Sequence, residues 1–365
     1  HFWPATMYIE GLDQYRGWFQ SSLLVAVGAL GRGAPFKECV THGWTVDGEG
    51  KAMHKSLGNG MDPAEIFDKY GADLLRLWAG SADYHVDVRC SDEIFKQLSQ
   101  NYLKFRNTCK FCLDNLVGFD ADHLVQPDEM LPLDKWAVTR LNTLIEKVFA
   151  AYDNYEFHVV SHMVNDFCVV DLSSFYFDII KDRLYCGEEN SLERRSAQSA
   201  VWMILDAMTR LFAPILAFTC DEVWLAMPHR AGDDARNVLL NQMVQPYAAY
   251  ALSEEEMGKW ARLAALRTAV NGALEQARAD KTIGKSLEAE VDLTVTAEDA
   301  FLTDMDAADL ADLLIVSQVR VEVGAELTVA VRPANGAKCL RCWKVLPTVG
   351  SDAAHPDLCP RCAAV

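Results

Sequence analysis

The sequence predicts a multidomain, mainly α-helical protein with an α/β segment at its start and a cysteine-rich module at its end. Three observations support this. Residues 1–90 alternate short apolar runs with helical patterns, residues 91–285 repeat an apolar residue every three or four positions, and the final thirty residues contain four cysteines. Half of the 365 residues are hydrophobic, which is enough to bury several cores.

The α/β segment, residues 1–90, follows a regular order of elements. It contains an apolar run at 6–10 that ends at Gly11, a helical pattern from Asp13 to Leu30, an apolar run at 39–41, a tight loop at 47–50, and a helix that Asp62-Pro63 starts. This order of strand, helix, strand, glycine-rich loop and helix is typical of an α/β nucleotide-binding sheet near the carboxyl ends of its strands.

From Ser91 the period changes to that of a helix bundle over residues 91–285. One apolar face runs through Ile94, Leu98, Tyr102, Phe105, Cys109, Cys112 and Leu116. Further helical patterns cover residues 133–152, 156–185, 192–228 and 254–280. Pro214 is expected to divide the third of these into two helices, because proline interrupts a helix interior.

A small α/β junction over residues 286–332 and a zinc module over residues 333–365 complete the predicted order. Apolar residues alternate in the junction, which favours strands. The module contains Cys339-x2-Cys342 and Cys359-x2-Cys362, with sixteen residues between the pairs. Each pair offers two thiolates, and four ligands leave no open position, so the spacing predicts one structural Zn²⁺. Two disulfides or free thiols are the alternatives.

Another closely spaced pair, Cys109-x2-Cys112, favours a structural role. Both cysteines lie on the apolar helix face, and no second pair accompanies them. We therefore expect buried core cysteines and not a metal or redox site.

Two further patterns resemble functional motifs only in part. His158 and His162 are four residues apart on a predicted helix, but Val159 stands where a metalloprotease carries glutamate. The segment TIGKS, residues 282–286, resembles the end of a phosphate-binding loop, but Ala279 stands where the motif needs glycine. We expect structural histidines and no phosphate-binding loop of that kind.

Composition points to a cytoplasmic protein that does not enter a membrane. Eleven cysteines, mostly single and in apolar stretches, favour a reducing compartment. No secretory signal opens the sequence, and the longest uncharged run, residues 17–31, is too short to span a bilayer. The opening stretch HFWPATMYIEGLDQ, dense in polar and aromatic residues, suggests part of a larger protein.

The net charge of −18 argues against general nucleic-acid binding, but two basic islands interrupt the acidic background. Residues 259–285 contain six basic and two acidic residues, and residues 332–365 contain five basic and two acidic residues. Such islands can favour one selected polyanion. Ordinary charge scatter is the alternative.

Polar residues at the end of the first predicted strand form a candidate ligand site. Glu10, Asp13 and Gln14 can hold an ammonium group or ribose hydroxyls, and Trp18 can line an apolar pocket. Asp13 is equally well placed to be a helix N-cap. In the loop GKAMHKSLGN, Lys55 can stabilise phosphate charge.

Blocks along nearly the whole chain resemble isoleucyl-tRNA synthetases, which are class I aminoacyl-tRNA synthetases. The blocks, in order, are DQYRGWF, HGWTVDGEGKAMHKSLGN, GADLLRLW, DYHVDVRCSDEI to KFRNT, FYFDIIKDRLY, APILAFTCDEVW, LEQARADKTIGKSLEA and the final cysteine pairs. The resemblance implies that residues 1–90 are the second half of a Rossmann-type catalytic domain, and that the bundle binds the tRNA anticodon.

The resemblance also implies roles for single residues. The stretch AMHKS, residues 52–56, stands where the family carries KMSKS, a loop that closes on ATP and stabilises the pyrophosphate leaving group. Met53, Lys55 and Ser56 match this motif, whereas Ala52 and His54 depart from it. We expect Lys55 to be the main phosphate lysine, and Lys51 to supply part of the missing charge through its flexible side chain.

For the remaining site residues, the resemblance implies contacts with the other substrates. Glu10, Gly11, Asp13 and Gln14 are expected to bind the aminoacyl-adenylate, Trp18 to line the isoleucine pocket, and His42, Gly43 and Met53 to bind ATP. The zinc module is expected to contact tRNA. The implied reaction joins isoleucine to tRNA(Ile) with ATP, with Mg²⁺ accompanying the nucleotide, in a monomeric enzyme.

No HIGH motif, first half of the nucleotide fold or editing domain is found in the sequence, so this segment alone is expected to be inactive. Three alternatives remain open. The chain can be a free-standing tRNA- or RNA-binding module with a vestigial nucleotide site, which the departures at Ala52 and His54 favour. It can also be a sister synthetase for valine, or a purely structural scaffold of helices and zinc.

Overall fold

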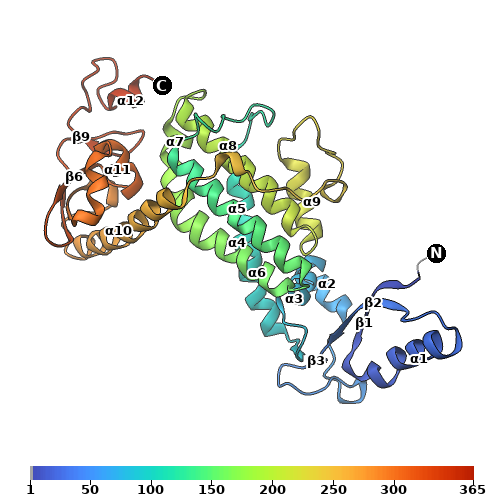
Figure 1. Cartoon of the computed structure of the whole chain (residues 1–365). Helices are drawn as coiled ribbons and strands as arrows, with labels where there is room; N and C mark the ends of the chain where they lie inside the picture. Colours follow the sequence, from blue (N-terminus) through green and yellow to red (C-terminus); the bar gives the residue numbers. More distant parts are fainter. Residues whose placement is uncertain (1–2) are drawn as a thin grey trace.

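The computed structural model describes residues 3–365, and the side chain of Lys55 lies outside the described part. Figure 1 shows an α/β module at the N-terminal end, a helical bundle in the centre, and a sheet with a cysteine module near the C-terminus. The two end modules lie at opposite ends of the bundle. Within residues 3–365, no helix combines the length and apolar character needed to cross a bilayer.

The α/β module contains two small parallel sheets. Strand β1 (Ala5–Gly11) pairs with β2 (Phe36–His42), and β3 (Thr45–Val46) pairs with β4 (Val88–Arg89). A short 3₁₀ helix (Lys55–Leu57) follows in the loop, and then α2 (Pro63–Tyr70) and α3 (Ala72–Ser81). Asp62 caps α2 by accepting a hydrogen bond from the N–H of Ala64. The predicted order of elements is confirmed.

The prediction of one helix from Asp13 to Leu30 is wrong, and so is the alternative that Asp13 caps it. The structure has a 3₁₀ helix (Leu12–Arg16), then α1 (Trp18–Leu24), then a π-helical turn (Val25–Ala29). Gly17 interrupts the helix, and the side-chain oxygen of Gln14 accepts a hydrogen bond from the N–H of Trp18 at 2.9 Å. A Cβ at Gly17 would lie 2.6 Å from that oxygen, so glycine leaves room for this cap.

The bundle matches the predicted helical periods closely. Its elements are α4 (Asp92–Asn115), α5 (Pro132–Asp153), α6 (Phe157–Asp166), a π-helical segment (Phe167–Tyr176), α7 (Phe177–Cys186), α8 (Leu192–Phe212), α9 (Ala217–Ala226) and α10 (Glu254–Ala279). Pro214 separates α8 from α9, as predicted. Cys109 and Cys112 are buried in the core, and burial raises the pKa of both thiols, which confirms the structural interpretation.

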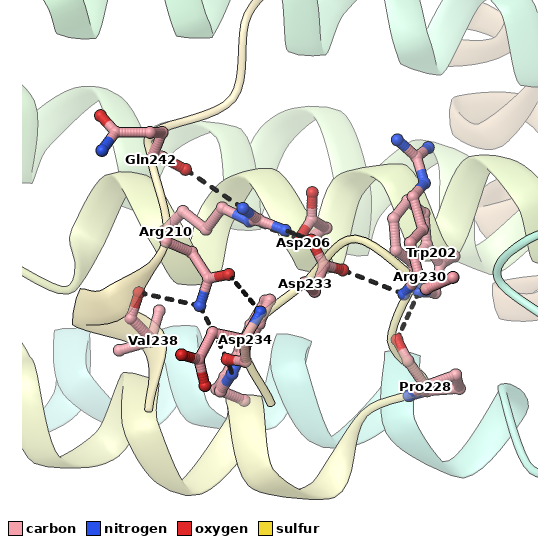
Figure 2. Close-up of polar contacts among 12 residues, drawn as sticks. Trp202, Asp206, Arg210, Pro228, Arg230, Asp233, Asp234, Val238 and Gln242 are labelled. Carbon is pink, nitrogen blue, oxygen red and sulfur yellow. Dashed lines mark hydrogen bonds and ion pairs between the residues drawn. The ribbon is translucent and has the colours of Figure 1, made fainter. Parts of the chain in front are cut away.

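The long connection between α9 and α10 is held against the bundle by buried polar contacts (Figure 2). Arg210 donates to Asp206 and Asp233, both at 2.7 Å, and to the carbonyl of Gln242 at 3.2 Å. The indole N–H of Trp202 donates to the carbonyl of Pro228 at 2.8 Å. These contacts satisfy a guanidinium group that is only 11% exposed, and they fix an otherwise irregular segment. That segment includes two 3₁₀ turns (Val238–Leu240 and Ala248–Tyr250).

The C-terminal elements comprise a three-stranded sheet and the cysteine module. Strand β5 (Ala289–Val295) lies between β6 (Gln318–Val323), to which it is parallel, and β7 (Thr328–Pro333), to which it is antiparallel. Helix α11 (Ala307–Leu314) and 3₁₀ helices (Ser286–Glu288 and Ala297–Asp304) accompany the sheet. The module contains β8 (Ala337–Lys338), β9 (Val345–Leu346) and α12 (Pro360–Ala363). The predicted strand alternation is confirmed at Val291, Leu293 and Val295, which are all buried.

A polar clamp joins α3 to the turn between α8 and α9. Asp73 accepts hydrogen bonds from the backbone N–H of Phe218 at 3.3 Å and of Thr219 at 2.7 Å, and from the Thr219 hydroxyl at 2.6 Å. Arg76 donates to the carbonyls of Pro214 at 2.6 Å and Ile215 at 3.0 Å. Asp73 therefore acts as the N-cap of α9 from a different helix, and the α/β module is joined to the bundle through it.

We expect Asp73→Ala to lower the free energy of unfolding by about 2–4 kcal/mol, because it removes a cap and leaves buried N–H groups without an acceptor. Urea denaturation followed by circular dichroism measures this change. Asp68→Ala, at an exposed position of α2, is the matched control and is expected to leave the transition unchanged. Equal unfolding midpoints for the two variants would show that the clamp does not stabilise the fold.

Candidate functional site

The predicted ligand residues lie at the carboxyl edge of the β1–β2 sheet. In the parallel register Glu10 lies opposite Thr41 and Gly11 lies opposite His42. Glu10 is exposed, and Gly11 is buried close to Trp44. The structure therefore brings together Glu10, Gly11, His42 and Gly43, which the sequence separates by about thirty residues. Parallel α/β sheets bind ligands at this edge.

Two residues of the neighbouring 3₁₀ turn, Asp13 and Gln14, make local hydrogen bonds. The side-chain amide of Gln14 donates to Asp13 at 3.3 Å, and its oxygen caps α1. Trp18 is 53% exposed and its ring stacks against Tyr8, with 6.0 Å between centroids. Trp18 thus presents an apolar face next to the strand ends, which suits the wall of a pocket.

Two backbone contacts hold the turn after β2, and the sequence alone did not reveal them. The N–H of Gly43 donates to the carbonyl of Tyr84, and the N–H of Trp44 donates to the carboxylate of Asp87, both at 2.8 Å. A Cβ at Gly43 would overlap the backbone of Val86, so only glycine permits this approach. The ring of His42 is oriented by its contact at 2.8 Å with the Gly43 carbonyl oxygen.

The glycine-rich loop begins with a backbone turn after β3. An isolated bridge pairs Val46 with Ala52, and the N–H of Asp47 donates to the carbonyl of Lys51 at 2.9 Å. Lys51 forms an exposed ion pair with Glu49 at 2.6 Å. An exposed pair of this kind contributes roughly 0–1 kcal/mol, so a phosphate group can displace Glu49 from the ammonium group.

The remainder of the loop carries the predicted phosphate residues. Met53 is half-buried and packs against the main hydrophobic core, whereas Ser56 is exposed. Lys55 starts the 3₁₀ turn, but its side chain lies outside the described part of the structure. The loop is thus anchored at Met53 and exposed to solvent at Ser56.

The four predicted zinc ligands form one buried cluster. The sulfur atoms of Cys339, Cys342, Cys359 and Cys362 all lie within 4.8 Å of one another. Zn–S bonds of about 2.3 Å in a tetrahedron place sulfur atoms roughly 3.8 Å apart, so the cluster fits zinc. Without a metal, burial raises the pKa of Cys342 and Cys362, whereas backbone N–H groups that point at the sulfur lower the pKa of Cys339 despite its burial.

The cysteine module is attached to the rest of the protein by ion pairs. Arg361 forms a two-pronged pair with Asp182 of α7, with one contact of 2.8 Å, and Lys344 pairs with Asp312 of α11. Burial opposes ionisation of Asp182, but the Arg361 pair lowers its pKa overall. The thiol of Cys186 packs against the cluster from the end of α7. The module is therefore held against both α7 and α11.

The predicted basic islands are smaller on the folded surface than in the sequence. Ion pairs within the chain use Lys259, Arg262, Arg267 and Arg278 of the first island, and Arg332, Lys344 and Arg361 of the second. By contrast, Lys285 and Lys338 lie 5.5 and 6.0 Å from the ring centroid of Trp343. Trp343 is 56% exposed, so an aromatic and basic surface remains beside the cysteine cluster.

Comparison with known proteins identifies the family. Three family models match: "tRNA synthetases class I (I, L, M and V)" over residues 1–91, "Anticodon-binding domain of tRNA ligase" over residues 134–293, and "Zinc finger found in FPG and IleRS" over residues 336–365. The chain is 46% identical to an isoleucine–tRNA ligase of Thermoanaerobacter sp. over 377 aligned residues, which cover 99% of the chain. The chain belongs to the isoleucyl-tRNA synthetase family.

A second isoleucine–tRNA ligase, from Geobacter sulfurreducens, is also 46% identical over 99% of the chain. The chain spans about 40% of the length of these curated relatives. The match to the zinc-finger model and the buried cysteine cluster together support one structural zinc site in this member of the isoleucyl-tRNA synthetase family.

Solved structures of related class I synthetases share the fold. A LeuRS from Agrobacterium radiobacter K84, in a ternary complex with tRNA and LeuAMS, aligns with a TM-score of 0.51 and 16% identity, covering 92% of this chain and 33% of its own. A methionyl-tRNA synthetase of Mycobacterium tuberculosis with methionyl-adenylate aligns with a TM-score of 0.52 and 17% identity, covering 61% of this chain and 44% of its own.

We expect the purified chain to contain one Zn²⁺ and Cys342→Ser to lose it, because three thiolates no longer close the tetrahedron. Elemental analysis measures the metal content, and limited proteolysis measures the order of residues 333–365, which should be cleaved faster in the variant. Cys39→Ser, at an exposed cysteine in β2, is the control and should retain the metal. Full zinc content in Cys342→Ser would contradict the site.

Proposed function

We propose that the protein containing this chain activates isoleucine with ATP and transfers it to tRNA(Ile), releasing AMP and pyrophosphate. One observation carries the proposal. The parallel register of β1 and β2 places Glu10 and Gly11 beside His42 at one sheet edge, in a chain 46% identical to isoleucine–tRNA ligases. The proposal includes a monomeric, cytoplasmic enzyme, with Mg²⁺ bound by the nucleotide.

At the carboxyl edge of the β1–β2 sheet, the surroundings of each predicted residue allow a contact with one part of the aminoacyl-adenylate. Glu10 is exposed at a strand end and can accept hydrogen bonds from the ammonium group or the ribose of the adenylate. Gly11 and Gly43 permit close approach of a ligand to the backbone. Asp13 and Gln14 border the same site, Trp18 presents its ring to the side chain of isoleucine, and His42 lies beside the adenine.

The loop after β3 is proposed to bind the phosphates of ATP. Lys55 and Ser56 would contact the phosphates, and Lys51 would add a second positive charge after leaving Glu49. The amino-acid carboxylate attacks the α-phosphorus, and pyrophosphate leaves with its negative charge stabilised by these groups. Met53 packs against the core and would hold the base of the loop in place while the loop closes on ATP.

An exposed apolar face next to this site supports the proposal that further protein completes it. Large apolar side chains on β1 and the helices that follow it are more than one third exposed: Ile9, Leu12, Tyr15, Trp18, Leu24, Val25, Val27 and Leu30. A concentration of exposed apolar side chains in one region suits a protein interface. We propose that the adenylate site is built jointly with such protein, so that these residues alone do not activate isoleucine.

The remaining modules are proposed to bind tRNA(Ile). The family model for anticodon binding covers most of the bundle, residues 134–293. Beside the cysteine cluster, Trp343 offers an exposed aromatic ring, and the ammonium groups of Lys285 and Lys338 lie 5.5 and 6.0 Å from its centroid. Such a surface suits an unpaired base and its phosphate.

ATP–pyrophosphate exchange on the complete reading frame that contains this sequence tests the proposal. We expect exchange with isoleucine to exceed exchange with valine by about 10- to 200-fold, because one methylene contributes roughly 1–3 kcal/mol in an apolar pocket. A preference for valine would assign the sister enzyme. No exchange by a folded, zinc-loaded protein would favour the free-standing RNA-binding module, which the departures at Ala52 and His54 already suggest.

We expect Lys51→Ala to slow isoleucine-dependent exchange about fivefold, as the loss of roughly 1 kcal/mol from one exposed charge predicts. The matched variant Glu49→Gln removes the competing carboxylate, so its rate should equal or exceed that of the wild type. Both rates are measured at saturating isoleucine and varied ATP. An unchanged rate for Lys51→Ala would show that Lys51 does not supply the missing charge.

A further inference from the structure

The side chain of Asn59 spans the base of the glycine-rich loop. Its amide nitrogen donates to the carboxylate of Asp47 at 2.8 Å and to the carbonyl of Ala52 at 3.1 Å. Its amide oxygen accepts a hydrogen bond from the N–H of His54 at 2.9 Å. The half-buried amide of Asn59 therefore uses both of its N–H donors and its oxygen acceptor. All three hydrogen bonds go to residues of the same loop, at positions 47, 52 and 54.

Asp47 holds the other side of the same loop. One carboxylate oxygen accepts hydrogen bonds from the backbone N–H of Glu49 at 3.0 Å and of Lys51 at 2.9 Å, and the other accepts the amide of Asn59. The N–H of Lys51 and the amide of Asn59 lower the pKa of Asp47, so its carboxylate is ionised at neutral pH. Together, Asp47 and Asn59 fix the backbone at residues 49, 51, 52 and 54, which lead into Lys55 and Ser56.

We propose that Asp47 and Asn59 form a clasp that positions the loop bearing Lys51, Lys55 and Ser56 for the phosphates of ATP. The proposal rests on the function proposed above for this loop. Both clasp residues hold backbone groups of the loop, so the proposal assigns them a positioning role and not a catalytic one. Holding the loop in advance lowers the entropy that must be lost when ATP binds.

The clasp also explains how this loop accommodates Ala52 and His54. Asn59 contacts the carbonyl of residue 52 and the N–H of residue 54, and neither contact uses a side chain. Replacing the side chains at these two positions therefore leaves the hydrogen bonds of the clasp intact. The departures remove side-chain charge and a hydroxyl from the loop, but they do not remove the contacts that shape its backbone.

The pair is chemically specific, and this gives a sharp test. In Asn59→Asp the new carboxylate faces the carboxylate of Asp47 and can donate to neither Asp47 nor Ala52, so the clasp should open. The double variant Asp47→Asn with Asn59→Asp reverses the pair. The new amide at position 47 then donates to the new carboxylate at position 59. The acceptors for the N–H groups of Glu49, Lys51 and His54 are retained, and only the carbonyl of residue 52 loses its partner.

The first readout is isoleucine-dependent ATP–pyrophosphate exchange by the complete protein. We expect Asn59→Asp to lower kcat/KM for ATP roughly 10- to 100-fold, as for the loss of a hydrogen bond to a charged group, with KM for isoleucine unchanged. The reversed pair should recover to within about fivefold of the wild type. Asn190→Asp, the same change at an exposed turn between α7 and α8, is the control and should have no effect.

The second readout does not depend on activity. Hydrogen–deuterium exchange of the 365-residue chain should show faster exchange of residues 49–58 in Asn59→Asp, slower exchange again in the reversed pair, and no change in Asn190→Asp. If the wild type lacks ATP–pyrophosphate exchange activity but the hydrogen–deuterium pattern is as expected, the proposed function fails. The clasp then remains a structural feature without that role. An active wild type with an unaffected Asn59→Asp variant, or no recovery in the reversed pair, would overturn the clasp.

Discussion

Buried N–H groups at the start of α9 need an acceptor, and Asp73 of α3 supplies it. Helix α9 has no side-chain cap of its own, so its first turn depends on a carboxylate nearly 150 residues away in the sequence. The neighbouring Arg76 satisfies the last carbonyls before the same helix. Because both residues lie on one short helix, the clamp contributes to the orientation of the α/β module relative to the bundle, together with the packing of α3 against α4 and α6.

Three parts of the molecule, the bundle, the cysteine module and the β1–α1 region, are stabilised in different ways. The bundle buries large side chains completely, among them Trp202, Trp224 and Tyr176, and one hydrophobic core continues from α2 and α3 into the C-terminal sheet. The cysteine module is too small for such a core and instead depends on its thiol cluster and on ion pairs to α7 and α11. The β1–α1 region packs the rings of Tyr8, Phe19 and Phe36 together, while many of its other apolar side chains are exposed.

Contacts that end on backbone groups shape the proposed catalytic edge. Gly43 lies against the backbone of Val86, the side chain of Gln14 caps α1, and the side chain of Asn59 holds the backbone at residues 52 and 54. Such contacts leave the side chains that face the solvent free to vary. This separation between shape and charge explains how the loop keeps its backbone contacts with alanine at position 52 and histidine at position 54.

The sequence by itself determined the helices of the bundle, the alternation of β5 and the four-cysteine cluster, because these depend on periodicity and spacing between nearby residues. It also carried the family resemblance. Only the tertiary structure decided that Asp13 does not cap a helix, that Gly43 and Trp44 are held by residues 84–87, and that most of the basic islands are neutralised. Each of these depends on a partner distant in the sequence or on a local backbone break, which no period along the chain records.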